Sequence, residues 1–414
     1  MMDMSAKRIM LFGMGDVCYD IISSFNIKLK EYLENKGIAV DLINVNGRTG
    51  YSRDIVECFE KNSYAAAISF NSAGEGMIKG KDGINLFDHY NVPYYLFLLD
   101  HPMDHYVKIV NGPDNMHVIC IDRDHVDYVR KLRPDTEKIH FILPGGMETG
   151  GAKDASEADF LKRPYELVFT GTRKDLSALG DDILSLEPPF KTIAAELAEL
   201  MLSERQLTND EALERILKDN GLEGLPGSDF AAMENVVNRA NLYVRTYVRE
   251  EIVRILMASD IRFDIFGNGW DGLMSEAGEN VRLHGSVSYS ETLRLNGKAK
   301  LMLNIMPWFK NGSHDRIPTA MLNGAAVLTD HSRYLDECFL TEAGNDEKLF
   351  FYDIEHPERV GSIASGILAD RERLYRTAGR GREYAEGHMT WEQTGDAVLR
   401  LIEEASKFSD NINF

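Results

Sequence analysis

The sequence is poor in cysteine, in positive charge and in long apolar runs. Its cysteines are Cys18, Cys58, Cys120 and Cys338, without C-x-x-C spacing, which argues against a zinc ribbon or disulfide scaffold and favours a reducing compartment. Lys and Arg number 46 against 66 Asp and Glu, a formal net charge of −20, so we expect no nucleic-acid partner. No run approaches the roughly 18 apolar residues of a membrane span, and the first apolar stretch is too short for a signal peptide. A cytoplasmic protein without a transmembrane segment is expected.

Length and composition are those of an ordinary globular protein. Hydrophobic residues make up 44% and charged residues 27% of the 414 positions, which excludes a disordered or fibrous chain. At about 150 residues per domain, the length predicts two or three domains.

Short apolar segments alternate with helical ones in the first 150 residues. The segments lie at 8–12, 40–45, 65–70, 94–99, 118–121 and 139–143. Near-continuous apolar strands separated by helices are typical of a parallel sheet covered on both faces. Residues 1–150 are therefore predicted to form a Rossmann-like α/β domain.

The second half repeats this rhythm after a polar, glycine-containing linker at 147–164. Its apolar segments lie at 166–170, 263–266, 281–284, 301–305 and 325–329. Residues 176–250 and 358–408 are helical in pattern. We predict a second Rossmann-like domain at 165–390 with a helical insertion at 176–250, and a closing helix at 391–414. Small and polar residues follow almost every strand, so the two sheets are expected to face a common cleft.

The glycines after the first strand do not predict a dinucleotide site. Gly13-x-Gly15 would begin such a fingerprint, but Cys18 stands where the third glycine belongs. The next strand ends in Asn44 rather than an acidic residue. A plain tight turn is the favoured interpretation.

The histidines after the segment at 94–99 do not predict a metal site either. His101 and His105 are spaced for one helix face, beside Asp100 and Asp104. No third ligand stands in register, so solvated loop residues are favoured and no metal is expected.

The segment from 263 to 335 carries the most specific signal in the sequence. It runs through Asp264-Ile265-Phe266-Gly267-Asn268-Gly269-Trp270, His284-Gly285-Ser286, Asn311-Gly312-Ser313-His314-Asp315-Arg316 and Thr319-Ala320. This succession resembles the donor-nucleotide domain of GT-B glycosyltransferases, most closely the CgeB-type, spore-maturation-protein-like branch of the glycosyltransferase family 1/4 group. Gly381-Arg382-Glu383-Tyr384 and His388-Met389-Thr390-Trp391 resemble the closing helices of that branch. The resemblance covers about 168–402; the first half shares only its βα pattern and Asp100-His101-Pro102.

The resemblance implies a hexosyltransferase-type enzyme of class EC 2.4, acting in bacterial glycosylation. It implies transfer of a sugar from a nucleotide-sugar, with a UDP-sugar favoured, to a hydroxyl of a protein or glycan. GT-B enzymes typically stabilise the departing diphosphate with helix N-termini, amides and cationic side chains, so no metal or other cofactor is expected. The final helix, 391–414, is implied to cross back to the first domain.

The residues implied to bind the donor follow the strand ends of the second half. Arg316 and nearby loop amides are expected at the phosphates, Gly267 to let backbone approach the base or ribose, and His284 to lie under the base. The full set is Gly171, Thr172, Arg173, Lys174, Gly267, Asn268, His284, Gly285, Ser286, Asn311, Gly312, Ser313, Arg316 and Thr319. Simpler interpretations stay open: Arg316 as an ion-pair partner of a nearby aspartate, and Arg173 with Lys174 as a solvated pair.

The acceptor side is expected in the first domain. Asp100 or His101 would accept the acceptor's proton if the reaction inverts, and Asp16 is the rival base. Gly13 and Gly15 would shape the loop beside it. A turn before Pro102 is the simpler interpretation of Asp100 and His101.

One departure from the family pattern keeps alternatives open. Many relatives carry two glutamates eight positions apart here, the second commonly holding the ribose hydroxyls; this chain has Asn311 and Thr319. Arg316 is then the better candidate for phosphate contact. A catalytically inactive nucleotide-binding or structural protein and a sugar-nucleotide epimerase are the alternatives. Nothing in the sequence indicates an oligomeric state.

Overall fold

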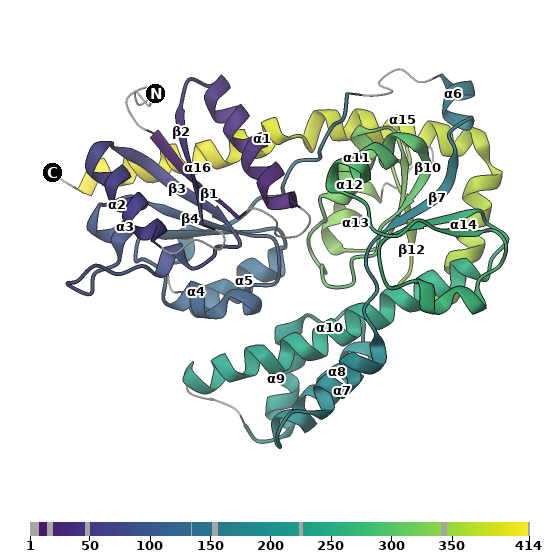
Figure 1. The fold of residues 1–414 in the computed structure, drawn as a ribbon, viewed down its shortest axis with the longest axis horizontal. Helices are drawn as coiled ribbons and strands as arrows, with labels where there is room; N and C mark the ends of the chain where they lie inside the picture. Colours follow the sequence, from purple (N-terminus) through teal and green to yellow (C-terminus); the bar gives the residue numbers. More distant parts are fainter. Residues whose placement is uncertain are drawn as a thin grey trace. The chain divides into compact units, whose positions relative to one another are not determined.

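The computed structural model describes residues 8–14, 20–45, 50–133, 135–150, 156–222, 227–340 and 346–412. Contacts between Cα atoms divide the chain into two units (Figure 1). The first comprises Met1–Gly145 with Met389–Phe414, and the second Gly146–His388. No helix in the described ranges is both long and apolar enough to span a membrane.

The first unit is built on a six-stranded parallel sheet. Its strands, in the order β2-β1-β3-β4-β5-β6, are β1 (Arg8–Gly13), β2 (Ala39–Asn44), β3 (Tyr64–Phe70), β4 (Tyr94–Leu98), β5 (Met116–Cys120) and β6 (Ile139–Phe141). Every residue of β3 and β4 is buried. Strands buried along their whole length indicate a sheet covered on both faces, as the apolar segments predicted.

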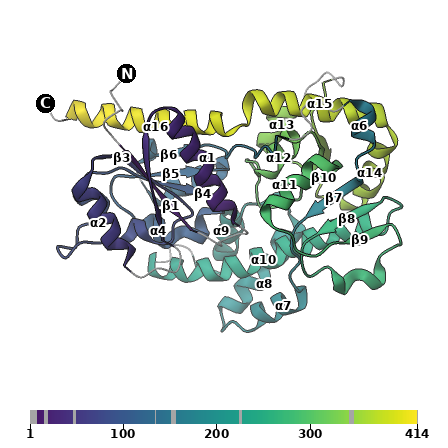
Figure 2. The same ribbon diagram turned by 45° about the horizontal axis from the view of Figure 1, so that its top comes forward.

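Helices cover both faces of this sheet (Figures 1 and 2). They are α1 (Ile21–Asn35), α2 (Tyr51–Lys61), α3 (Leu86–His89), α4 (Tyr106–Val110), α5 (Arg123–Leu132) and α16 (Trp391–Ile412), with short 3₁₀ turns η3 (Glu75–Met77), η4 (Pro102–His105) and η5 (Thr136–Lys138). Helix α16 packs against α1 and β3. The Trp391 ring lies 4.9 Å from Phe25 and 6.4 Å from Phe70, centroid to centroid. Its first turn is thereby fixed to the core of the first unit.

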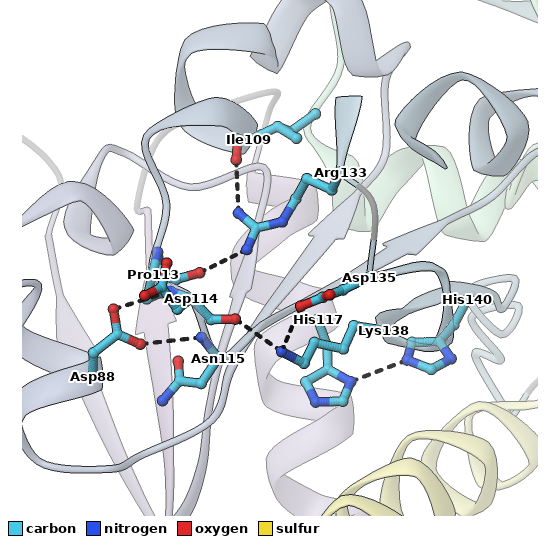
Figure 3. Close-up of polar contacts among 10 residues, drawn as sticks. All are labelled: Asp88, Ile109, Pro113, Asp114, Asn115, His117, Arg133, Asp135, Lys138 and His140. Carbon is cyan, nitrogen blue, oxygen red and sulfur yellow. Dashed lines mark hydrogen bonds and ion pairs between the residues drawn. The ribbon is translucent and has the colours of Figure 1, made fainter. Parts of the chain in front are cut away.

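Polar contacts fix the far edge of the sheet, around β5 and β6 (Figure 3). Arg133 donates to the carbonyls of Ile109 and Pro113, both at 3.0 Å. His117 on β5 and His140 on β6 stack, with ring nitrogens 3.1 Å apart. Arg133 thus ties the segment before β6 to the segment before β5, and the two histidines tie β5 to β6.

The second unit has its own six-stranded parallel sheet, in the order β12-β11-β10-β7-β8-β9. Its strands are β7 (Tyr165–Thr170), β8 (Phe263–Phe266), β9 (Val281–Leu283), β10 (Ala299–Leu303), β11 (Ala326–Asp330) and β12 (Phe350–Tyr352). The edge strand β12 is missing from the prediction. Its three residues are too few for a periodic signal, and it pairs with β11 through the backbone.

The helices of the second unit include the predicted insertion. Helices α7 (Leu176–Leu184), α8 (Phe190–Ser203) and α9 (Asn209–Asp219) pack on α10 (Gly227–Met257) (Figure 1). The remaining helices are α6 (Glu157–Leu161), α11 (Tyr289–Lys298), α12 (Arg316–Leu322), α13 (Arg333–Phe339), α14 (Val360–Ala369) and α15 (Arg371–His388), with 3₁₀ turns η6 (Asp271–Glu276) and η7 (Pro357–Arg359). The prediction of two parallel α/β sheets with a helical insertion is confirmed.

Two details differ from the expected boundaries. Helix α10 extends past residue 250 because Ile252, Val253 and Leu256 belong to the core of the second unit. The linker contains α6, which the Ser156 side chain caps and whose Phe160 joins the same core.

Each sheet has one point where the strand order reverses, between β1 and β3 and between β7 and β10. Ligands of open α/β sheets bind beyond the carboxyl ends of the strands at such points. The topology therefore predicts a ligand site at the loops after β7 and β10 in the second unit, and at the loops after β1 and β3 in the first.

Candidate functional site

Buried polar atoms without partners gather at the reversal point of the second sheet. Among the described residues, Arg249 Nε, Tyr289 Oη, Asn304 Oδ1, Ser313 Oγ and Arg316 Nη1 are each buried without a hydrogen bond. Most buried polar groups in proteins are satisfied. These five are donors and acceptors that a polar ligand would satisfy, and two of them belong to cations.

Arg316 is the first residue of α12. Its backbone nitrogen lies 3.3 Å from His314 Nδ1. Burial lowers the pKa of its guanidinium; the charge of Asp315 opposes this effect, and that of Arg245 adds to it. A cation held under these conditions favours an anionic ligand.

Asp315 does not neutralise Arg316 alone, because it is shared with a histidine. His314 Nδ1 lies 2.7 Å from Asp315 Oδ1. Burial alone would raise the pKa of Asp315, but His314 and Arg316 together hold it below the ordinary value. The carboxylate is therefore ionised and divided between two partners.

A pocket lies beside Arg316, between α11, α12 and the ends of β7 and β10. Three of the residues with unpartnered atoms, Tyr289, Asn304 and Arg316, contribute to its wall. Thr319, which stands where many relatives carry the ribose-binding glutamate, also lines it, and its hydroxyl accepts a hydrogen bond from Met147 N at 3.0 Å. Burial raises the pKa of the Tyr289 hydroxyl, which keeps it a donor.

The loop before α12 is held by its neighbours. Ser332 Oγ donates to the Gly312 carbonyl at 2.7 Å, and Arg333 N donates to Lys310 O at 2.9 Å. Asn311 is half-buried, and Ser313 is buried with a free hydroxyl. The predicted phosphate loop is therefore fixed, with the Ser313 hydroxyl available to a ligand.

The loop after β7 is engaged by α10. Arg173 Nε lies 2.6 Å from Glu250 Oε2, and Glu250 is only 5% exposed. Arg249 Nη1 donates to the Thr172 carbonyl at 3.1 Å. Lys174 is exposed, and no ion pair joins it to another described residue. Of the two predicted cations in this loop, Lys174 alone keeps an uncompensated charge.

The glycines after β8 serve a close approach between two loops. A Cβ atom at Gly267 would lie 2.2 Å from the carbonyl oxygen of Gly171, and one at Gly269 would lie 2.2 Å from that of Arg173. Both glycines have positive φ angles, 142° and 86°. The space that we expected a base or ribose to fill next to Gly267 is thus filled by the loop after β7, where Arg173 N donates to Asn268 O.

His284 directly follows β9, and the strands β7 and β8 separate β9 from β10. Its Nε2 lies 2.7 Å from Asp264 Oδ1, and its ring stacks on Phe266 at 4.1 Å. Gly285 and Ser286 are exposed. Asp264 and Phe266 therefore fix the orientation of the ring, so that His284 presents a fixed polar edge beside two exposed loop residues.

In the first unit, strained backbone marks the reversal point. Asn71 and Ser72, directly after β3, have left-handed φ angles of 60° and 50°, which cost non-glycine residues about 1 kcal/mol or more each. Lys108 Nζ donates to both of their carbonyls, at 3.0 and 2.8 Å. Asn71 Nδ2 donates to Asp100 Oδ2 at 2.9 Å. Such strain concentrates at functional sites, and here it surrounds the carboxylate of Asp100.

The two predicted bases after β4 occupy different environments. Asp100 is half-buried at the strand end, whereas His101 is 4% exposed. His101 Nδ1 accepts from Met103 N, and its ring contacts His125 at 4.4 Å. Gly13 ends β1, and a Cβ atom added there would meet only ordinary contacts, with Leu42 at 3.5 Å and the Ile43 carbonyl oxygen at 3.9 Å. The predicted Gly15 and Asp16 lie outside the described residues.

Four contributors to the site escaped the sequence prediction. Tyr289 and Asn304 stand singly in the sequence without a motif. Arg245 and Arg249 are four residues apart, a spacing that places two residues of a helix on the same face. Their Arg-x-x-x-Arg pattern within the insertion was the available signal.

Comparisons with known proteins agree with this architecture. Residues 245–400 match a family model described as glycosyl transferase-like. HepE from Anabaena, solved with UDP and glucose, superposes with a TM-score of 0.53 at 11% identity, covering 96% of this chain and all of that one. Sucrose-phosphate synthase from Thermosynechococcus elongatus gives 0.55 at 12% identity, covering 96% and 98%. A glycosyltransferase from Rickettsia africae gives 0.54 at 9% identity, covering 97% and 99%. No curated protein sequence matches the chain.

The fold is GT-B. Both parallel sheets and the closing helix of the first unit correspond to this architecture over nearly the whole chain. The family-model match begins at Arg245 and so includes the end of α10, the loop after β10 and α12. The unpartnered atoms of the second GT-B sheet lie within this matched region.

Proposed function

We propose that this chain is a glycosyltransferase that moves a sugar from a nucleotide-sugar, with a UDP-sugar favoured, to a hydroxyl group of a protein or glycan. The observation that carries the proposal is the group of unpartnered buried atoms around Arg316. They lie at the strand reversal of the second sheet, where α/β folds bind ligands. The glycosyl transferase-like match over 245–400 and the GT-B fold support it.

In the proposed reaction, the acceptor oxygen attacks the anomeric carbon as the bond from that carbon to the β-phosphate oxygen breaks. The nucleoside diphosphate leaves with the bonding electrons and gains negative charge. Arg316 and the Ser313 hydroxyl are proposed to stabilise this charge. Because side chains of this unit supply the positive charge, we propose that no metal ion takes part.

Asp100 is the proposed base if the reaction inverts. Its carboxylate lies at the strand end beside the strained Asn71 backbone, while His101 is buried and caps η4. The proton of the acceptor hydroxyl would pass to Asp100 as the new bond forms. The first unit is thus proposed to bind the acceptor, and the CgeB-type branch remains our proposed family assignment, with the cytoplasm as the proposed location.

Thermal denaturation with UDP, GDP, dTDP, CDP and ADP, with and without EDTA, tests the donor site. A diphosphate at 100 times its Kd should add about 2.7 kcal/mol of stability. We expect UDP to stabilise the wild type regardless of EDTA, and Arg316→Ala to lose this effect. Absence of a shift with every nucleotide would overturn the assignment.

Two alternatives predict different products. An inactive GT-B protein would bind the nucleotide but release no diphosphate from any nucleotide-sugar. A sugar-nucleotide epimerase would convert the donor without an acceptor and leave the diphosphate attached. Chromatography of the nucleotide products separates all three functions.

A further inference from the structure

Helix α10 of the insertion directs two arginines toward the proposed donor site. Arg245 and Arg249 are one turn apart on one face of the helix. Their guanidinium carbons lie 4.0 and 5.6 Å from the centre of the same indole ring, Trp308. Trp308 belongs to the loop that connects β10 to α12, and its ring is 6.2 Å from that of His314.

The Arg249 guanidinium has unused donors. One Nη1–H binds the Thr172 carbonyl, and the buried Nε has no partner. Burial, followed by the charges of Arg316 and Arg245, lowers the pKa of Arg249 to about 9. The guanidinium groups are therefore close enough to repel one another, and a bound anion would relieve that repulsion.

Arg173, one of the two cations predicted at the donor site from the loop after β7, is neutralised in the structure. Glu250 follows Arg249 directly in α10, and it accepts from both Arg173 and Arg254, at 2.6 and 2.7 Å. The two neighbouring residues of α10 thus have opposite effects. Glu250 neutralises the positive charge of Arg173. Arg249 brings a positive charge, without a counter-ion among the described residues, to the same loop.

The charges around Trp308 favour a negatively charged ligand. Arg249 and Arg316 contribute two positive charges with unpartnered donor atoms, while Asp315 contributes one negative charge that it shares with His314. This excess of positive charge favours a phosphate-bearing ligand over an uncharged nucleoside. Arginine also binds phosphate oxygens with two parallel donors.

We propose that α10 supplies the second cation of the diphosphate site: Arg249, supported by Arg245 on Trp308, contacts the diphosphate in place of Arg173. The helical insertion then forms part of the donor site rather than an appendage of the second unit. This inference rests on the proposed function, because it names further contacts for the same leaving group.

Calorimetric titration of the full chain with UDP, UMP and uridine tests the proposal. For Arg249→Gln we expect UDP binding to weaken by about tenfold or more, the effect of losing a charged hydrogen bond. The loss should be smaller for UMP and absent for uridine. A role in merely holding the Thr172 loop would weaken all three ligands equally.

Two further variants, one near Trp308 and one control on the same helix, accompany Arg249→Gln. Arg245→Gln removes the neighbouring cation without touching the Thr172 carbonyl, and it should also weaken UDP more than uridine. Arg239→Gln is the control, because Arg239 lies on α10 but pairs with Asp182 at 2.6 Å, away from Trp308. It should leave UDP binding unchanged.

The outcomes distinguish a failure of the α10 assignment from a failure of the proposed function. If the wild type binds UDP and both Arg249→Gln and Arg245→Gln bind it equally well, the role of α10 is overturned and the proposed function stands. If the wild type binds no nucleoside diphosphate, the proposed function fails and the α10 assignment fails with it.

Discussion

Arg173 and Glu250 form an ion pair 2.6 Å long that joins the loop after β7 to helix α10. Glu250 is buried and also holds Arg254, so one carboxylate compensates two guanidinium groups. The pair engages, in a structural contact, a cation that the sequence predicted in the donor site. It also ties the insertion to the core sheet next to the proposed site.

Glu250→Gln should destabilise the protein by about 3 kcal/mol, because it leaves a mostly buried Arg173 without its counter-charge. Urea unfolding followed by circular dichroism measures the loss. Glu204→Gln is the matched control, since its ion pair with Arg215 is exposed on both sides and should contribute less than about 1 kcal/mol. Equal effects of the two substitutions would contradict a structural role for the Arg173–Glu250 pair.

Gly267→Ala should be destabilising because its Cβ would meet the Gly171 carbonyl oxygen at 2.2 Å. Gly285→Ala provides the comparison: its φ angle is also positive, 66°, but no atom lies within 4 Å of the added methyl. We expect Gly285→Ala to cost about 1 kcal/mol for its backbone alone, and Gly267→Ala clearly more. Thermal melting of both variants measures the two losses of stability. A smaller loss of stability for Gly267→Ala than for Gly285→Ala would refute the close approach of the two loops.

Stability should fall as the solution is acidified from pH 7 to pH 5, partly through the histidine pair of Figure 3. Burial, with lesser effects of His140 and Lys138, lowers the pKa of His117 to about 3; burial, then Arg130, lowers that of His140 to about 4. The unfolded chain, with ordinary values near 6.5, binds more protons in this range. The folded state therefore loses stability below pH 6.5, and the loss levels off below pH 3.

His117→Phe tests the contribution of this pair to that pH dependence. Phenylalanine keeps an aromatic ring against Tyr95, which stacks on His117 at 4.5 Å, but cannot take a proton. The drop in melting temperature between pH 7 and pH 5 should be smaller in the variant than in the wild type. An unchanged slope would mean that the buried His105 and His125, whose pKa values burial also lowers, carry the effect alone.

Asp100→Asn should lower kcat by about a hundredfold if Asp100 accepts the acceptor's proton, the usual contribution of a general base. The amide retains the shape of the side chain, so binding of UDP by the second unit should not change. Steady-state kinetics together with UDP titration measure both quantities. An unaltered kcat would remove Asp100 from the reaction and is the result expected of a retaining enzyme.

The sequence was informative where short-range patterns decide the structure. Eleven of the twelve strands were predictable because their residues are mostly apolar, and β3 and β4 are buried along their whole length. Strand β12 was missed because its three residues are too few to form a pattern. The loop containing Asn311 and Arg316 was recognisable from its motif.

The partners of individual site residues were not predictable. Arg173 and Glu250 are 77 residues apart, and so are Arg249 and Thr172; no local pattern specifies such contacts. Nor could the sequence show that the glycines at 267 and 269 serve the packing of two loops. These features depend on the tertiary structure that brings β7, β8 and α10 together.

The release of UDP from UDP-sugars by the purified chain tests the central claim most directly. The account predicts measurable UDP release, increased by a suitable hydroxyl acceptor, insensitive to EDTA and strongly reduced in Arg316→Gln. Arg239→Gln should retain the wild-type rate. A wild type that releases no diphosphate from any nucleotide-sugar, with or without acceptors, would contradict the assignment as a glycosyltransferase.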